Sequence, residues 1–122
     1  RSTPLFGESV SYPIQTKIAQ LMEQEFYPEG SEIELTQPSL VLIRRGQIEL
    51  LMEEKTPQIV EEGEFCGEET ILGQQRRFLM RAVKDSRVYK ISDSELLREI
   101  PIVRWKLLER SEQRNSAFWL EA

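Results

Sequence analysis

The sequence lacks histidine altogether and contains one cysteine in 122 residues. Without histidine, the serine and cysteine triads that use His as their base are excluded, and so are metal sites built on imidazole. The single cysteine, Cys66, excludes an internal disulfide and a cysteine-rich zinc site. A lone cysteine is typical of a reducing compartment, so we expect the protein to be cytoplasmic.

An excess of basic residues and long apolar runs are also absent. The formal net charge is -5, whereas binding to nucleic-acid phosphates or to an anionic membrane requires an excess of lysine and arginine. No apolar run approaches the roughly 20 residues that a membrane span needs. The sequence begins with Arg1 and shows no signal-peptide pattern. We therefore expect residues 1–122 to be a single globular domain cut from a longer polypeptide.

Helical patterns lie at the two ends of the sequence. Pro13 suits the first turn of a helix, and apolar residues recur at helical spacing up to Met22, which predicts a short amphipathic helix over residues 13–24. Near the other end, Asp93 or Ser94 can cap a helix, and Pro101 can start another one.

The last predicted helix has an interrupted apolar stripe. Its first turns carry apolar residues at spacing three, including Trp105, which we expect to lie in the core. Residues 109–116 are wholly polar, which argues against a long coiled-coil seam. Trp119 follows this gap, where it could cover a ligand or pack back on the domain.

The middle of the chain predicts short strands separated by turn residues. The strands are expected at residues 32–35, 40–43, 47–52, 59–60, 78–84 and 87–91. Gly46 can adopt a positive φ, so we expect the second and third strands to form a tight hairpin there. Short strands at regular spacing suggest a sandwich or a jelly-roll barrel. A metal-dependent barrel enzyme that binds its metal through histidine is excluded, because histidine is absent.

One stretch, residues 63–82, combines the chemistry that a ribose-phosphate ligand requires. Gly67, Glu68 and Glu69 begin a single helical turn, whose free N–H groups can face an anion. Arg76 and Arg77 follow, and an arginine fork binds phosphate oxygens in a bidentate manner. A nearby carboxylate can accept hydrogen bonds from sugar hydroxyls. The alternative interpretation is that these are solvated loop charges that pair with one another.

The sequence resembles the cyclic nucleotide-binding domain, the regulatory module of the catabolite activator protein family, of cAMP-dependent kinase regulatory subunits and of gated channels. Four segments carry the resemblance in order: 26–30 (FYPEG), 42–50 (LIRRGQIEL), 63–68 (GEFCGE) and 81–91. The resemblance spans about residues 25–110. It implies a mainly β fold, an eight-stranded jelly-roll (double-stranded β-helix) barrel with a short N-terminal helix and C-terminal helices.

The resemblance also implies roles for individual residues. In the family, the glutamate of the phosphate-binding cassette takes the ribose 2′-hydroxyl, and Glu68 stands at that place after Gly67. The cassette arginine takes the cyclic phosphate, and that place falls on Arg76. Arg77 stands where the family has a small residue, and it would block the pocket or add a second cation. The predicted ligand-binding set is Gly67, Glu68, Glu69, Arg76 and Arg77. Cys66, just before Gly67, is expected to pack in the core.

These observations leave three hypotheses of function. The first is a regulatory module that binds a cyclic nucleotide, most simply cAMP, and relays a conformational change through its C-terminal helices to an effector domain of the same polypeptide. The second is a barrel that has lost nucleotide binding and serves in docking or assembly, which Arg77 and Phe78 favour because the family has small residues there. The third is an enzyme using Glu68 and Glu69, which we rank last because no nucleophile or metal set accompanies them. We expect no cofactor and no metal, and a homodimer is left open.

Overall fold

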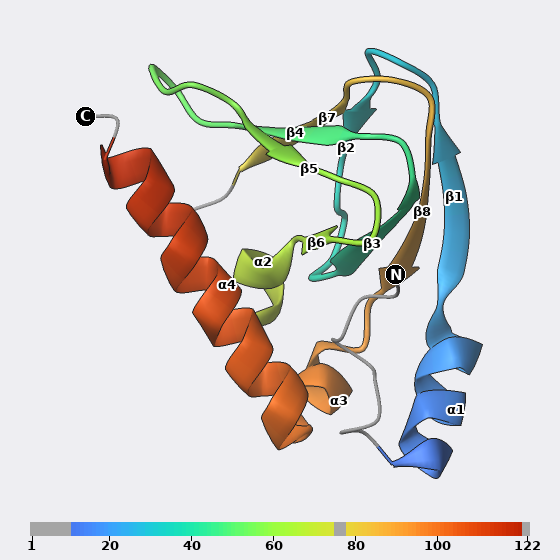
Figure 1. The fold of residues 1–122 in the computed structure, drawn as a ribbon. Helices are drawn as coiled ribbons and strands as arrows, with labels where there is room; N and C mark the ends of the chain where they lie inside the picture. The colour runs from blue at the N-terminus through green and yellow to red at the C-terminus, as the bar shows by residue number, and fades with distance from the viewer. Residues whose placement is uncertain (1–10, 75–77, 121–122) are drawn as a thin grey trace.

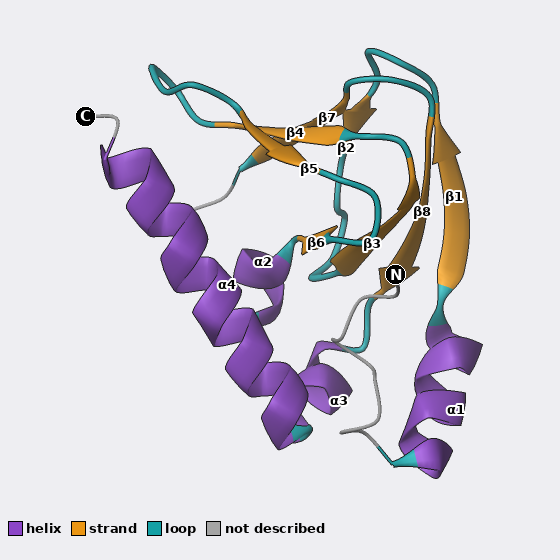
Figure 2. Ribbon diagram, in the orientation of Figure 1, coloured by secondary structure: helices purple, strands orange, loops and turns teal. Residues whose placement is uncertain are grey.

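A computed structural model describes residues 11–74 and 78–120, with side chains up to residue 117. Within these ranges, one helix precedes a region of β-strands, a short helix lies among the strands, and two helices follow them (Figure 1; Figure 2). In chain order the elements are α1 (Tyr12–Leu21), β1 (Glu23–Tyr27), β2 (Glu32–Ile33), β3 (Leu40–Arg45), β4 (Ile48–Leu51), β5 (Gln58–Val60), β6 (Phe65–Cys66), α2 (Glu68–Ile71), β7 (Leu79–Ala82), β8 (Ser86–Ile91), α3 (Ser94–Glu99) and α4 (Pro101–Leu120). The predicted mainly β class, with eight strands and flanking helices, is confirmed for the described residues.

The strands form two antiparallel sheets of four. Sheet A has the order β1-β8-β3-β6, and sheet B has the order β2-β7-β4-β5. Among the described strands no pairing joins the two sheets into a closed barrel. The eight strands of the predicted barrel are therefore present, while the jelly-roll arrangement stays a prediction.

The strand β3 lies between two apolar cores, which explains its unbroken apolar sequence. Successive side chains of a strand point to opposite faces of the sheet. Leu40 and Leu42 belong to a core cluster shared with α1, α3 and α4, whereas Val41 and Ile43 belong to a cluster shared with sheet B. All four side chains are buried. Sheet A is thus the middle layer, with helices on one face and sheet B on the other.

The predicted hairpin at Gly46 is wrong. β3 pairs with β6 and β8, whereas β4 pairs with β5 and β7, so the chain crosses from sheet A to sheet B at this turn. Gly46 has a φ of 102°. A Cβ there would collide with the Ser86 hydroxyl and would lie 2.7 Å from the Asp85 carbonyl oxygen. A glycine turn can join two paired strands of one sheet, or it can lead the chain from one sheet to the other. Only the strands with which β3 and β4 pair distinguish these two arrangements.

The first helix ends earlier than its apolar pattern predicts. α1 ends at Leu21, three residues before the predicted end at residue 24, and Met22 is already extended, with ψ of 130°. Glu23 then pairs with Lys90 of β8. Strand pairing with sheet A therefore outweighs the helical pattern, which is a tertiary effect. Pro13 lies in the first helical turn, as predicted.

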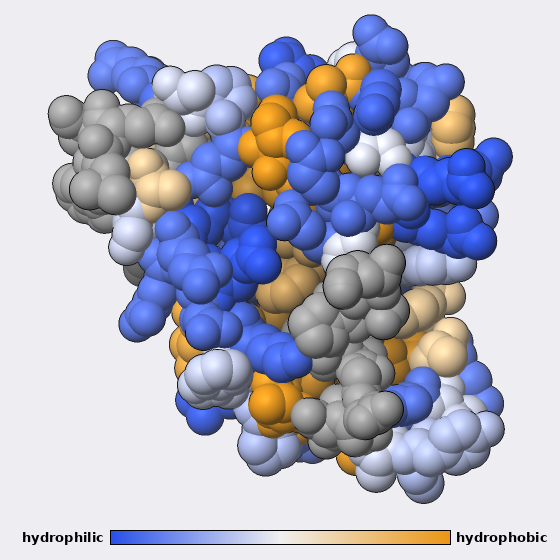
Figure 3. Space-filling model, in the orientation of Figure 1, coloured by the Kyte–Doolittle hydropathy of each residue, from blue (hydrophilic) through white to orange (hydrophobic). Residues whose placement is uncertain are grey.

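The C-terminal helices follow the predicted start signals. The Asp93 side chain caps α3 by accepting a hydrogen bond from the Leu96 backbone N–H at 3.0 Å. α4 begins at Pro101 and continues without interruption through the polar stretch. The expectation that Trp105 lies in the core is wrong, since 57% of this residue is exposed. Figure 3 shows mainly hydrophilic side chains over the middle of α4. None of the described helices is long and apolar enough to cross a membrane.

Candidate ligand-binding site

The short helix α2 places the predicted site residues. Gly67 precedes it with φ of 88°, and a Cβ at this position would lie 2.5 Å from the Ser39 carbonyl oxygen. The Thr70 hydroxyl accepts a hydrogen bond from the Ser39 backbone N–H at 3.0 Å and lies 2.7 Å from the Gly67 carbonyl oxygen. All four residues of α2 are buried. The predicted single helical turn is confirmed, and its position is fixed by close contact with the segment before β3.

Glu68 forms a buried ion pair with an arginine of the last helix. The Arg114 Nε donates to Glu68 Oε2 at 2.6 Å, and Nη2 donates to Glu68 Oε1 at 3.4 Å. The same Nη2 donates to the Phe65 carbonyl oxygen at 2.9 Å. Only 1% of Glu68 and 5% of Arg114 are exposed. This pair connects α4 directly to α2, and removing either partner would leave the other charge buried without compensation.

Glu69 is the next residue on α2, and its side chain turns to Phe78, the residue just before β7, rather than to α4. Its Oε2 accepts a hydrogen bond from the Phe78 backbone N–H at 3.4 Å. Burial raises the pKa of the Glu69 carboxyl to about 7, and the neighbouring charge of Glu68 raises it as well. The two adjacent carboxylates of α2 therefore have different partners, and only Glu68 is paired with a cation among the described residues.

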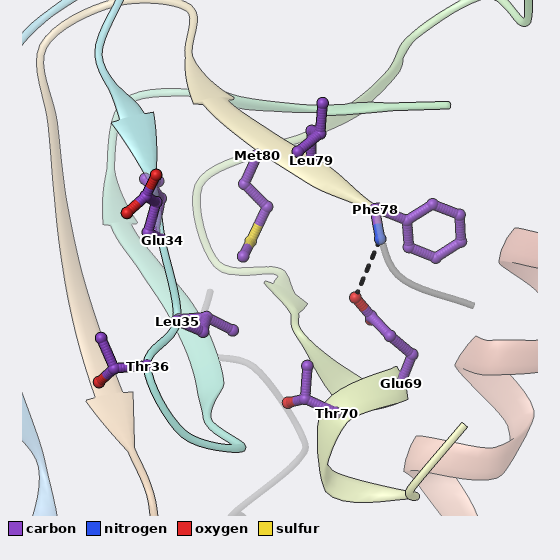
Figure 4. Close-up of a pocket in the computed structure, with 9 residues that line it drawn as sticks. Glu34, Leu35, Thr36, Glu69, Thr70, Phe78, Leu79 and Met80 are labelled. Carbon is purple, nitrogen blue, oxygen red and sulfur yellow. Dashed lines mark hydrogen bonds between the residues drawn. The ribbon is translucent and has the colours of Figure 1, made fainter. Parts of the chain in front are cut away.

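Two cavities lie near α2. The larger, about 380 Å³, lies between α2, β7 and the segment that begins in β2; Figure 4 shows Glu69, Met80 and Leu35 around it. The smaller, about 150 Å³, lies between α4 and the segment that includes β5, and Arg110 and Arg114 help to line it. No residue lines both cavities. The larger one is mainly apolar with a buried carboxylate, and the smaller one has arginine side chains in its wall.

The structure brings Gly67, Glu68 and Glu69 together in one turn, as the sequence predicts. Arg76 and Arg77 lie outside the described residues, so their proposed phosphate contacts stay predictions, as do the ligand contacts of the other three. The side chain of Trp119 is likewise outside the described side chains. Cys66 is fully buried, with its Sγ 3.7 Å from the Met80 Sδ, which confirms the packing role.

The sequence analysis missed Arg114, although a signal was present. The buried stripe of α4 runs through Val103, Leu107, Ser111 and Arg114, at helical spacing. Polar residues thus continue the core-facing stripe after the apolar ones end. The Ser111 hydroxyl accepts from the Gln74 side chain at 2.9 Å. A polar residue in phase with an apolar stripe therefore indicated a buried polar partner elsewhere in the fold.

Solved structures of other proteins share this arrangement. The regulatory subunit of a cAMP-independent protein kinase A from Trypanosoma brucei is 14% identical, and the match covers 96% of this chain and 44% of that one with a TM-score of 0.78. The catabolite activator protein of Thermus thermophilus is 23% identical, with 98% and 61% covered and a TM-score of 0.70. A putative cyclic nucleotide-binding protein from Geobacter metallireducens is 24% identical, with 94% and 89% covered and a TM-score of 0.65.

The chain has the cyclic nucleotide-binding domain fold. No family model matches the sequence, and no curated protein matches it significantly. Comparison of three-dimensional structures therefore identifies the fold, whereas these comparisons of sequence find no significant match. The chain spans 44% of the kinase regulatory subunit and 61% of the catabolite activator protein, so it is shorter than either of these proteins.

Proposed function

We propose that this chain is a regulatory ligand-sensing module that binds a cyclic nucleotide, with cAMP as the first candidate. The observation that carries the proposal is the buried ion pair between Glu68 of the cassette and Arg114 of α4. It joins the residue expected at the ribose hydroxyl to the helix expected to carry the signal. Arg76 binds the cyclic phosphate in this proposal, with Arg77 as a second cation. The module acts without catalysis, in the cytoplasm, on an effector domain of the same polypeptide.

The proposed mechanism is competition for Glu68. Its two carboxylate oxygens now accept from Arg114 at 2.6 and 3.4 Å. A ribose hydroxyl that donates to one of them takes a place held by the guanidinium, which weakens the contact between α2 and α4. Arg114 keeps its hydrogen bond to the Phe65 carbonyl only if α4 stays in place. The ligand thereby binds one arrangement of α4 better than the other, which is the condition for a population shift.

Calorimetric titration with cAMP and with cGMP tests the binding step. We expect saturable binding that Arg76→Ala strongly weakens, because the phosphate then loses its cation, while Arg104→Ala, at an exposed position of α4, leaves it unchanged. Glu68→Gln should cost less and should reduce the preference for cAMP over 2′-deoxy-cAMP. An unchanged affinity for Arg76→Ala would contradict the phosphate assignment, and no binding of either nucleotide would contradict the sensor proposal.

Tryptophan fluorescence tests the relay step. The Trp119→Phe variant leaves Trp105 as the single tryptophan, and Trp105 lies on α4 with 57% of its surface exposed. We expect saturating cAMP to change its emission, because movement of α4 alters the surroundings of the indole. Binding by calorimetry without any change in emission or in α4 hydrogen exchange would contradict the relay through this helix.

A second candidate function is a docking or assembly domain without nucleotide binding. It is favoured by Phe78, whose bulk replaces a small residue of the family and whose backbone N–H donates to Glu69. One similar structure is described as a cAMP-independent kinase regulatory subunit. In this case Arg76→Ala and Glu68→Gln leave partner binding unchanged, and size-exclusion chromatography with light scattering reports whether the partner is a second copy.

A further inference from the structure

The larger cavity contains a buried carboxylate that forms no ion pair with any described residue. Glu69 is 3% exposed and lines this cavity of about 380 Å³. Its side chain accepts a hydrogen bond from the Phe78 backbone N–H at 3.4 Å, and its own backbone N–H and the more distant charge of Arg114 also favour the ionised form. Within the described ranges it forms no ion pair. A buried carboxylate without an ion-pair partner is costly unless it is protonated or meets further donors. The pKa of the Glu69 carboxyl, raised to about 7, has the same physical origin.

The rest of the wall combines apolar side chains with a second carboxylate and two threonines, Thr36 and Thr70. Ile33, Leu35 and Met80 supply apolar surface, and Figure 4 shows the Met80 side chain and the Glu69 carboxylate turned toward the same space. Glu34 adds a second carboxylate. The described residues that line the cavity include no lysine or arginine. The charge of the described wall residues repels an anion and favours a ligand that brings positive charge to Glu69.

We propose that this cavity binds a small organic cation, a primary ammonium carried on a compact apolar body. The ammonium donates to the Glu69 carboxylate, and the apolar body lies against Ile33, Leu35 and Met80. A volume of about 380 Å³ falls within the range of roughly 300 to 1,000 Å³ typical of small-molecule sites. The site is separate from the Glu68–Arg114 side of α2, so the proposal goes beyond the proposed function and does not depend on it.

Three probes with one apolar body test the proposal: phenethylammonium, 2-phenylethanol and 3-phenylpropanoate. We expect phenethylammonium to bind with a dissociation constant on the order of 1 mM, the alcohol more weakly and the carboxylate not measurably. Chemical shifts of backbone amides in α2 and β7 measure binding and locate it. Equal binding of the three probes, or shifts confined to α4 and β5, would overturn the proposal.

A matched pair of variants separates Glu69 from the general acidity of the chain. Glu69→Gln keeps the size of the side chain and removes its charge, and Glu62→Gln makes the same change at an exposed position. We expect Glu69→Gln to weaken phenethylammonium binding at least about tenfold and Glu62→Gln to leave it unchanged. Equal losses in the two variants would overturn the assignment. A thermal melt of each variant confirms that it is folded, and cAMP titration of Glu69→Gln reports separately on the proposed function.

The pH dependence of binding provides an independent check. The ionisable groups around Glu69 are Glu68 on the same helix, Arg114 of α4, Cys66 of β6 and Glu34 across the cavity. Burial keeps the Cys66 thiol neutral by raising its pKa. The ammonium group binds only the ionised form of the Glu69 carboxyl. The affinity of the protein for phenethylammonium should therefore rise by up to about tenfold from pH 6 to pH 8. A flat profile in the native protein, identical to that of Glu69→Gln, would contradict the site.

Discussion

The Arg114 guanidinium of the last helix lies 2.6 Å from the Glu68 carboxylate of α2, and both side chains are almost completely buried. Two residues that are 46 positions apart in the sequence thus form one charged unit inside the domain. The contact makes the position of α4 dependent on the state of α2. It also makes the stability of the domain depend on the pair remaining intact.

Removing the cation of this pair should destabilise the domain strongly. We expect Arg114→Met to lower the free energy of unfolding by about 3 to 5 kcal/mol, because Glu68 is then a buried charge without compensation. Adding Glu68→Gln to the same chain should recover much of this loss, which a double-mutant cycle in urea measures. Arg104→Met, at an exposed position of α4, should change stability by less than about 0.5 kcal/mol. Additive losses for the two members of the pair would show that they do not interact.

The raised pKa of Glu69 predicts that its protonation contributes to stability. Below its ordinary value near 4.5 this carboxyl is protonated in both the folded and the unfolded state. As the pH rises toward 7, the unfolded state loses this proton first, so the free energy of unfolding falls by about 3 kcal/mol and is constant above that. Glu69→Gln should remove this decline and should be the more stable protein at pH 8. Parallel stability profiles of the two proteins from pH 5 to 8 would refute the assignment.

Two glycines that flank α2 should respond differently to the same substitution. Both have positive φ, 88° at Gly67 and 74° at Gly73, so a side chain is strained at either place. A Cβ at Gly73 meets open space, whereas one at Gly67 would lie 2.5 Å from the Ser39 carbonyl oxygen. We expect Gly73→Ala to cost about 1 kcal/mol and Gly67→Ala about 3 kcal/mol or more. Chemical denaturation of the two variants measures the difference. An equal loss in the free energy of unfolding would mean that the segment before β3 moves away from the added methyl group with little strain.

The Cys66 thiol should be unreactive in the folded protein. It is fully buried, and burial raises its pKa far above the ordinary range of a thiol, so the thiolate that reacts with disulfide reagents is almost absent. We expect an aromatic disulfide reagent to modify Cys66 only at the rate of global unfolding, and in full once denaturant is added. Rapid modification under native conditions would show that β6 opens locally and that Cys66 has a reactive role rather than a packing role.

Several local features could be predicted from the sequence because neighbouring residues determine them. The Asp93 cap needs only the backbone N–H three residues later, and it forms as expected. The single turn after Gly67 and the start of α4 at Pro101 follow from local backbone geometry. Residues 40–43 are apolar without a break, which fits a strand buried on both faces.

Other features required the tertiary structure, because the same local sequence fits more than one arrangement. The turn at Gly46 could join two strands of one sheet or lead from one sheet to the other, and pairing across long sequence distances determined the result. The apolar spacing around Trp105 did not show which face of α4 meets the core.

The sequence by itself excluded imidazole chemistry and an internal disulfide. It also determined a mainly β domain with helices at its ends, and a short helix that begins with two adjacent carboxylates. Only the tertiary structure decided what those carboxylates do. Glu68 meets Arg114 of α4, while Glu69 remains without a cation among the described residues and faces an apolar cavity. The reason is physical, since burial and distant charges determine the partner and the pKa of a carboxyl, and neither can be read from its neighbours in the chain.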